Sequence, residues 1–152
     1  MSILCEKIQK PECHALVVRT MTAVENLPQV IGSSYHKIMT LLGEYGEQPI
    51  DVPFVAYYNM DMQNLDVEIG FVVAKPLPGR DDIQAVIYPS VAVASAMHAG
   101  PYESMAPTYE ALTAWLAEQG LQASGVVFEY YLNDPADVAP EEVLTRIEML
   151  LK

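Results

Sequence analysis

Two stretches of this chain, YHKIMTLLGEYGEQPIDVPFVAYYN (Tyr35–Asn59) and YEALTAWLAEQGLQASGVVFEYYLN (Tyr109–Asn133), align with each other without a gap. Nine of the 25 aligned positions hold the same residue, among them Gly46 and Gly120. Both stretches begin with apolar residues at helical spacing, continue through the shared glycine and end in an apolar, aromatic run. An internal duplication is the simplest explanation of this match.

Working outward from these stretches, each half of the chain shows the same order of predicted elements. Helices are predicted over residues 27–45 and 102–119, because apolar residues recur at helical spacing and a glycine follows each segment. Short apolar runs predict the strands, at 14–22, 52–58 and 65–73 in the first half and at 91–98, 126–132 and 143–151 in the second. We therefore predict a single domain over residues 1–152, made of two β-α-β-β half-repeats at 14–75 and 88–151.

Two such halves predict an α+β fold. We expect the halves to be related by a pseudo-twofold axis, with an antiparallel sheet that carries both helices on one face. The other face of the sheet is then left for solvent, another protomer or a ligand. Since the strands are apolar on both faces, we expect a concave ligand pocket or an interface there.

Composition excludes several classes of protein. Of the 152 residues, 51% are hydrophobic, which is enough for a core without disulfides or a metal. The net charge of −12 argues against direct binding to nucleic acid, and no apolar run approaches the roughly 20 residues that span a membrane. The first ten residues lack the apolar stretch of a secretion signal, so we expect a cytoplasmic protein. We expect no cofactor and no metal, with Cys5 and Cys13 as ordinary free thiols.

Charge is unevenly distributed along the chain. Between Arg80 and Arg146 there is no Lys or Arg, whereas ten residues are acidic. This half therefore favours a cationic partner over an anionic one, unless the charge serves only to keep the surface solvated.

One acidic residue interrupts an apolar strand. In VVFEYYL (Val126–Leu132), alternation places Val127, Glu129 and Tyr131 on one face and Val126, Phe128, Tyr130 and Leu132 on the other. We expect the second set to lie under the helices. The acid is then a functional candidate, because desolvation raises the pKa of a carboxyl group among apolar neighbours. The alternatives are an exposed acid on a solvated strand or an ion pair with Arg146.

The duplication helps to interpret this strand. Val55 occupies the position of Glu129 in the other half, so the fold itself does not require an acid there. Tyr57 likewise corresponds to Tyr131, and the twofold axis would bring both tyrosines towards a shared central region.

The second half resembles the GyrI-like effector-binding domains found in free-standing proteins and in AraC- and MerR-type regulators. The resemblance rests on four segments: His98-Ala99-Gly100-Pro101-Tyr102, Trp115-Leu116 with Gly120, Phe128-Glu129-Tyr130-Tyr131-Leu132-Asn133-Asp134-Pro135, and Thr145-Arg146-Ile147-Glu148-Met149-Leu150. It implies the duplicated β-α-β-β fold and a concave face that binds small, often hydrophobic and cationic, molecules.

The resemblance also implies a ligand site. Glu129 would lie at the base of an aromatic pocket, with Tyr131 and Tyr102 as wall residues, and the repeat adds Tyr57. In the last segment the family resembles the pattern T-E-I-Y-I-P. This chain departs from it at two positions: Arg146 replaces the glutamate, and Glu148 replaces the tyrosine. Arg146 could neutralise Glu129, and Glu148 could restore the negative charge.

Three functions follow from these observations. We favour a free-standing binding domain for a hydrophobic, cationic small molecule, acting as a sensor or a sequestering protein. A second hypothesis is a hydrolase of reactive cyclopropane-type natural products that uses Glu129 with a tyrosine; otherwise no catalytic residue is assigned. A third is a protein–protein modulator, such as a DNA gyrase inhibitor. A homodimer and a regulatory protein partner are further expectations, and we expect no membrane association.

Overall fold

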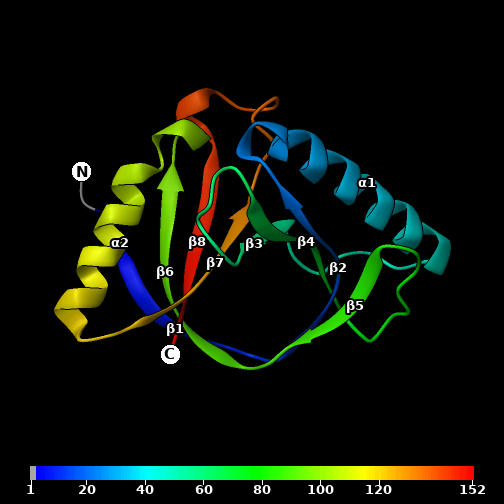
Figure 1. The fold of residues 1–152 in the computed structure, drawn as a ribbon, viewed down its shortest axis with the longest axis horizontal. Helices are drawn as coiled ribbons and strands as arrows, with labels where there is room; N and C mark the ends of the chain where they lie inside the picture. Colours follow the sequence, from blue (N-terminus) through cyan, green and yellow to red (C-terminus); the bar gives the residue numbers. More distant parts are fainter. Residues whose placement is uncertain (1–2) are drawn as a thin grey trace. The chain divides into compact units, whose positions relative to one another are not determined.

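The computed structural model describes residues 3–152 and divides the chain into two compact units. Unit 2 consists of Pro11–Ser90. Unit 1 combines the segment that ends at Lys10 with Val91–Lys152. Each unit contains one long helix and four antiparallel strands, which confirms the predicted α+β class (Figure 1).

Unit 2 is built on the first predicted half-repeat. Its elements are β2 (Cys13–Thr22), the 3-10 turn η1 (Val24–Asn26), α1 (Leu27–Tyr45), β3 (Phe54–Tyr57), β4 (Leu65–Val73) and β5 (Ile83–Tyr88). The strands pair in the order β3-β4-β2-β5. The predicted helix and the third predicted strand of this half agree with the structure at both ends.

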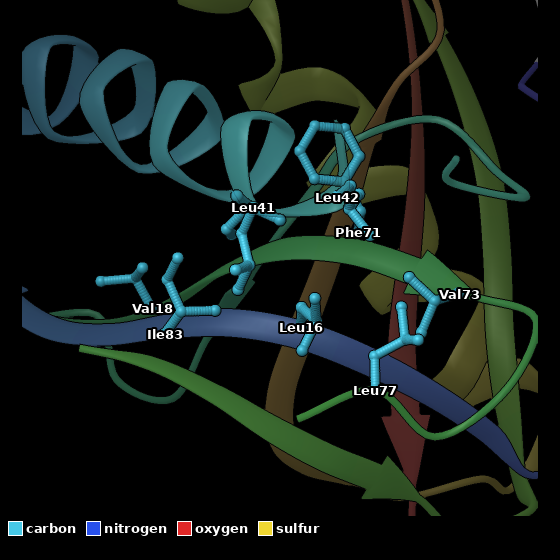
Figure 2. Packing of buried hydrophobic residues seen from close by; sticks show 9 residues of the cluster. Leu16, Val18, Leu41, Leu42, Phe71, Val73, Leu77 and Ile83 are labelled. Carbon is cyan, nitrogen blue, oxygen red and sulfur yellow. The ribbon is translucent and has the colours of Figure 1, made fainter. Parts of the chain in front are cut away.

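The core of unit 2 lies between α1 and its sheet. Leu41 and Leu42 point from the helix towards Leu16 on β2 and Phe71 on β4 (Figure 2). Leu77, which lies between β4 and β5 and outside the predicted half-repeats, packs in the same cluster. These contacts place the odd-numbered residues of β4 on the helix side and the even-numbered ones on the opposite face.

Unit 1 has the same plan. It contains β1 (Cys5–Lys10), β6 (Val91–Ala99), η2 (Tyr102–Ser104), α2 (Ala106–Gln119), β7 (Ala123–Tyr131), η3 (Pro140–Glu142) and β8 (Leu144–Leu151). The strand order is β1-β6-β8-β7. The helix predicted from residue 102 is divided, because a separate 3-10 turn precedes α2, which has a proline in its first turn.

Two strands, β1 and β5, were not predicted, and they exchange places between the halves. Strand β1 precedes β2 in the chain but pairs with β6, from Cys5 opposite Ala96 to Lys10 opposite Val91. Strand β5 precedes β6 but pairs with β2 in unit 2. The β-α-β-β description of each half is therefore incomplete, because each unit takes a fourth strand from the segment that leads into the other half.

Candidate functional site

Glu129 lies on the helix side of β7. It is opposite Ile147 of β8, which belongs to the core cluster under α2, and its exposed fraction is 9%. Val127, on the same face, packs against that cluster. The predicted alternation is therefore correct but its phase is wrong: Phe128 and Tyr130 face away from α2. Both sets of side chains in VVFEYYL are apolar enough to be buried, so the pattern could not decide between them.

Two tyrosine hydroxyl groups donate to this carboxylate. The Tyr131 hydroxyl donates to Glu129 Oε1 at 2.9 Å, and the Tyr109 hydroxyl donates to Oε2. Burial raises the pKa of Glu129, while the two hydrogen bonds act in the opposite direction. The desolvation of the carboxylate is thus only partly compensated by its neighbours.

Tyr109 is a site residue that the sequence analysis missed. It lies on α2, and its counterpart Tyr35 on α1 donates to the Phe54 carbonyl oxygen at 3.0 Å. Tyr109 donates to Glu129, and the residue of the first half that corresponds to Glu129 is Val55. The alignment of the two halves contained a signal for this residue. Both halves have a tyrosine at this position of the helix, but only the second half has an acid on the strand.

Tyr102 is brought to the same site by η2. Its ring lies edge-on to that of Tyr131, with centroids 5.5 Å apart, and it is 41% exposed. Partial burial, Asp134 and Glu129 together raise the pKa of Tyr102. Tyr57 lies in unit 2, opposite Val67 at the end of β3. Its role as a wall residue stays a prediction.

His98 is the last residue but one of β6 and lies beside this cluster. Its Nε2 lies 3.0 Å from the carbonyl oxygen of Pro101, and its Nδ1 lies 2.8 Å from Thr108 Oγ1. The ring therefore connects the strand end to the turn and to the first part of α2.

Glu148 differs from Glu129 in its partners. Its Oε2 lies 3.2 Å from Lys10 Nζ and 3.2 Å from Arg146 Nε. The Arg146 guanidinium also stacks 4.2 Å from the Tyr130 ring, on the face of the sheet that points away from α2. Arg146 therefore pairs with Glu148 rather than with Glu129, and neither residue alters the charge of Glu129 directly.

Glu68 is the buried acid of unit 2. It accepts hydrogen bonds from the hydroxyl groups of Tyr58, at 2.9 Å, and Tyr88. Arg19 Nη1 lies 3.8 Å from its second oxygen. Three glutamates are buried within residues 3–152, and of these only Glu129 has no Lys or Arg partner. This difference distinguishes Glu129 from acids whose charge is compensated internally.

Two further features are absent from the described residues. No group of three or more His, Cys, Asp or Glu side chains is placed to hold a metal ion. None of the helices combines the length and the apolar character needed to cross a membrane.

Comparison with known proteins assigns a family to nearly the whole chain. The GyrI-like small molecule binding domain matches residues 5–152. No curated protein matches the sequence.

Solved structures with the same fold share few residues with this chain. The C-terminal domain of EcmrR is 20% identical, with a TM-score of 0.75 over 100% of this chain and 99% of that domain. In the EcmrR–DNA complex this chain corresponds to 57% of the EcmrR chain (18% identity, TM-score 0.79, 99% of this chain).

Two further structures carry functional descriptions. A hydrolase from Listeria innocua is 16% identical, with a TM-score of 0.72 over 97% of this chain and 91% of its own. SAV2435, solved bound to tetraphenylphosphonium, is 12% identical, with a TM-score of 0.62 over 100% of this chain and 94% of its own. At these identities the likeness concerns the fold.

Proposed function

Since the chain belongs to the GyrI-like small molecule binding domain family, we propose that it binds a hydrophobic, cationic small molecule at Glu129. The observation that carries the proposal is the absence of a Lys or Arg partner at this buried carboxylate within the described residues. A bound cation would supply the missing counter-ion. We propose that the protein acts as a cytoplasmic sensor or sequestering protein for such a ligand.

The surroundings of Glu129 support a ligand with aromatic or other apolar groups. Tyr131 and Tyr102 stand edge to face next to the carboxylate, and an aromatic face attracts a cation by roughly 0.5–2 kcal/mol. Most of the affinity would come from apolar surface removed from water.

Tetraphenylphosphonium is a suitable probe, because its charge is permanent and its four aryl groups are apolar. We expect wild type to bind it in isothermal titration calorimetry, and Glu129→Gln to weaken binding by at least about tenfold, since a buried charge pair is lost. Triphenylphosphine oxide, a neutral probe of similar shape, should bind both proteins equally.

A control variant separates the local charge from the net charge. Glu110 follows Tyr109 on α2 and is exposed, so Glu110→Gln removes one negative charge without touching the site. Its affinity for tetraphenylphosphonium should stay within about twofold of wild type, because exposed charges are screened. An equal loss in both glutamine variants would contradict a specific role for Glu129.

A hydrolase is the second candidate, favoured by the raised pKa of Glu129 next to two tyrosine hydroxyl groups. The carboxylate would take a proton from water as the water oxygen attacks a strained cyclopropane carbon. A tyrosine hydroxyl would protonate the atom that accepts the electrons of the broken bond. Incubation with a cyclopropane-containing electrophile should then give a product heavier by one water, and Glu129→Gln should abolish it.

A further inference from the structure

We infer that His98 is a positioning residue of the ligand site, which holds Tyr102 and Tyr109 in place around Glu129. The inference rests on the proposed function, because it assigns a role within the same site.

His98 lies next to the site on the same face of the sheet. The register places it opposite Thr145 on β8, and Thr145 in turn lies opposite Tyr131 on β7. Glu129 occupies the adjacent row on the helix side, opposite Ile147. The imidazole is 5% exposed, so it is surrounded by the elements that it connects.

Both nitrogen atoms of the ring are occupied. The Pro101 carbonyl oxygen can only accept, so Nε2, at 3.0 Å, carries the proton and donates. In the neutral ring Nδ1 is then an acceptor, and the Thr108 hydroxyl at 2.8 Å donates to it. This arrangement leaves no buried polar atom of the ring unsatisfied.

Besides Ser104, whose Oγ lies 3.5 Å from Nε2, the partners of His98 are the residues that immediately precede the two tyrosines. Pro101 precedes Tyr102 at the start of η2, and Thr108 precedes Tyr109 on α2. One side chain therefore links both segments to β6. Without it, the turn and the first part of α2 would lose the bonds that hold them against the sheet at this point.

Gly100, between His98 and Pro101, supplies a backbone conformation that other residues rarely adopt. A Cβ atom at this position would lie 3.6 Å from His98 Nε2 and 3.3 Å from Ser104 Oγ, and the backbone has φ of +133°. The backbone N–H of Gly100 also donates to the Val143 carbonyl oxygen at 2.8 Å. A Cβ there would make only ordinary contact with the ring, so the turn after β6 needs glycine for its positive φ.

A double-mutant cycle on tetraphenylphosphonium affinity tests the inference. We expect His98→Leu to weaken binding by about tenfold and Thr108→Val by about fivefold, the usual range for lost buried hydrogen bonds. His98→Gln, which can donate to the carbonyl and accept from the hydroxyl, should restore most of the affinity. Because His98 acts through both tyrosines, His98→Leu should cost less than about twofold when Tyr102→Leu and Tyr109→Phe are already present.

A second readout needs no ligand. The Tyr109 hydroxyl proton, bonded to the Glu129 carboxylate, should give a slowly exchanging NMR signal in wild type. We expect that signal to broaden or vanish in His98→Leu. His36→Leu, on the exposed surface of α1, is the matched control and should change neither readout.

Two results would overturn the inference alone. One is an equal loss of affinity from His98→Leu in the presence and absence of the pair Tyr102→Leu and Tyr109→Phe. The other is a lowered Tm of His98→Leu with unchanged affinity and an unchanged Tyr109 signal, which would show a purely structural role. If His98→Leu does not fold, Thr108→Val and His98→Gln carry the same comparisons. Failure of wild type to bind, or indifference to Glu129→Gln, would instead refute the proposed function, and the inference with it.

Discussion

Two buried threonines near the site differ in a way that predicts opposite effects of the same substitution. Thr145 is fully buried, and within residues 3–152 its Oγ1 has no hydrogen-bond partner. Thr108 is 3% exposed and donates to His98. A buried hydroxyl without a partner costs free energy, whereas removing a bonded one leaves its partner unsatisfied.

We therefore expect Thr145→Val to raise the free energy of unfolding by up to about 1 kcal/mol, and Thr108→Val to lower it by about 1–3 kcal/mol. Urea denaturation of the two variants and wild type measures both values. The substitutions are identical in chemistry and volume change, so each serves as the control for the other. A loss of stability in Thr145→Val would show that its hydroxyl has a partner in solution.

Glu129→Gln should stabilise the ligand-free protein at neutral pH. Burial raises the pKa of Glu129 above the ordinary value of 4.5, so the native state binds this proton more tightly than the unfolded chain does. The group therefore favours folding below pH 4.5, and this contribution is lost as the pH rises through the folded-state pKa.

The advantage of glutamine should thus appear at neutral pH and disappear below pH 4.5. Thermal melting of both proteins as a function of pH measures it, with Glu110→Gln as the control for net charge. A lower Tm of Glu129→Gln at neutral pH would mean that the hydrogen bonds from Tyr109 and Tyr131 outweigh the desolvation of the carboxylate.

At the scale of the elements, glycines serve two different purposes, and alanine substitutions should separate them. Gly120 follows α2 with φ of +68°, and nothing lies within 4 Å of a Cβ built there. Gly70 lies inside β4 opposite Val17, and a Cβ there would overlap the Leu16 carbonyl oxygen. The first glycine is needed for its backbone conformation, the second for close contact between strands.

We expect Gly120→Ala to cost about 1 kcal/mol, the price of a left-handed alanine. Gly70→Ala should cost about 3 kcal/mol or more, because neighbouring backbone atoms cannot yield as a flexible side chain can. Chemical denaturation ranks the two. Equal losses would contradict the distinction between conformation and space.

At the scale of the whole molecule, the exchange of β1 and β5 makes unit 1 depend on the start of the chain. Strand β1 is the edge partner of β6, and Lys10 pairs with the buried Glu148 at 3.2 Å. Cys5 also packs against the core cluster under α2. Removing residues 1–10 would therefore take an edge strand, a cation and part of a core from a unit that otherwise begins at Val91.

Hydrogen exchange on a variant that lacks residues 1–10 tests this dependence. We expect β6 to lose amide protection by at least about tenfold, while β2 and β4 of unit 2 keep theirs, because exchange reports the stability of each region separately. Lys10→Met in the full chain is the milder control, since it removes the charge and retains the strand. A uniform loss of protection in both units would contradict the assignment of β1 to unit 1.

Much of the fold could be predicted from local patterns. The repeat is evident from the match between the two stretches. The helix over 27–45 and the strand over 65–73 could be predicted because the spacing of apolar residues, and a glycine at the end of a helix, are properties of neighbouring residues. Strands β1 and β5 were missed, since each has only six residues and a half-exposed pattern without strong alternation. Their pairing depends on residues far away in the chain.

At the site, the amino-acid order alone indicates that an acid lies inside an apolar, aromatic strand and that the other half has valine there. Tertiary structure alone decided that Glu129 faces α2, that Tyr109 donates to it, and that Glu148 rather than Glu129 has the cationic partners. The physical reason is that alternation along a strand defines two faces but not which one is covered. Which face a helix covers, and which charges meet, follows from packing between segments that local sequence does not specify.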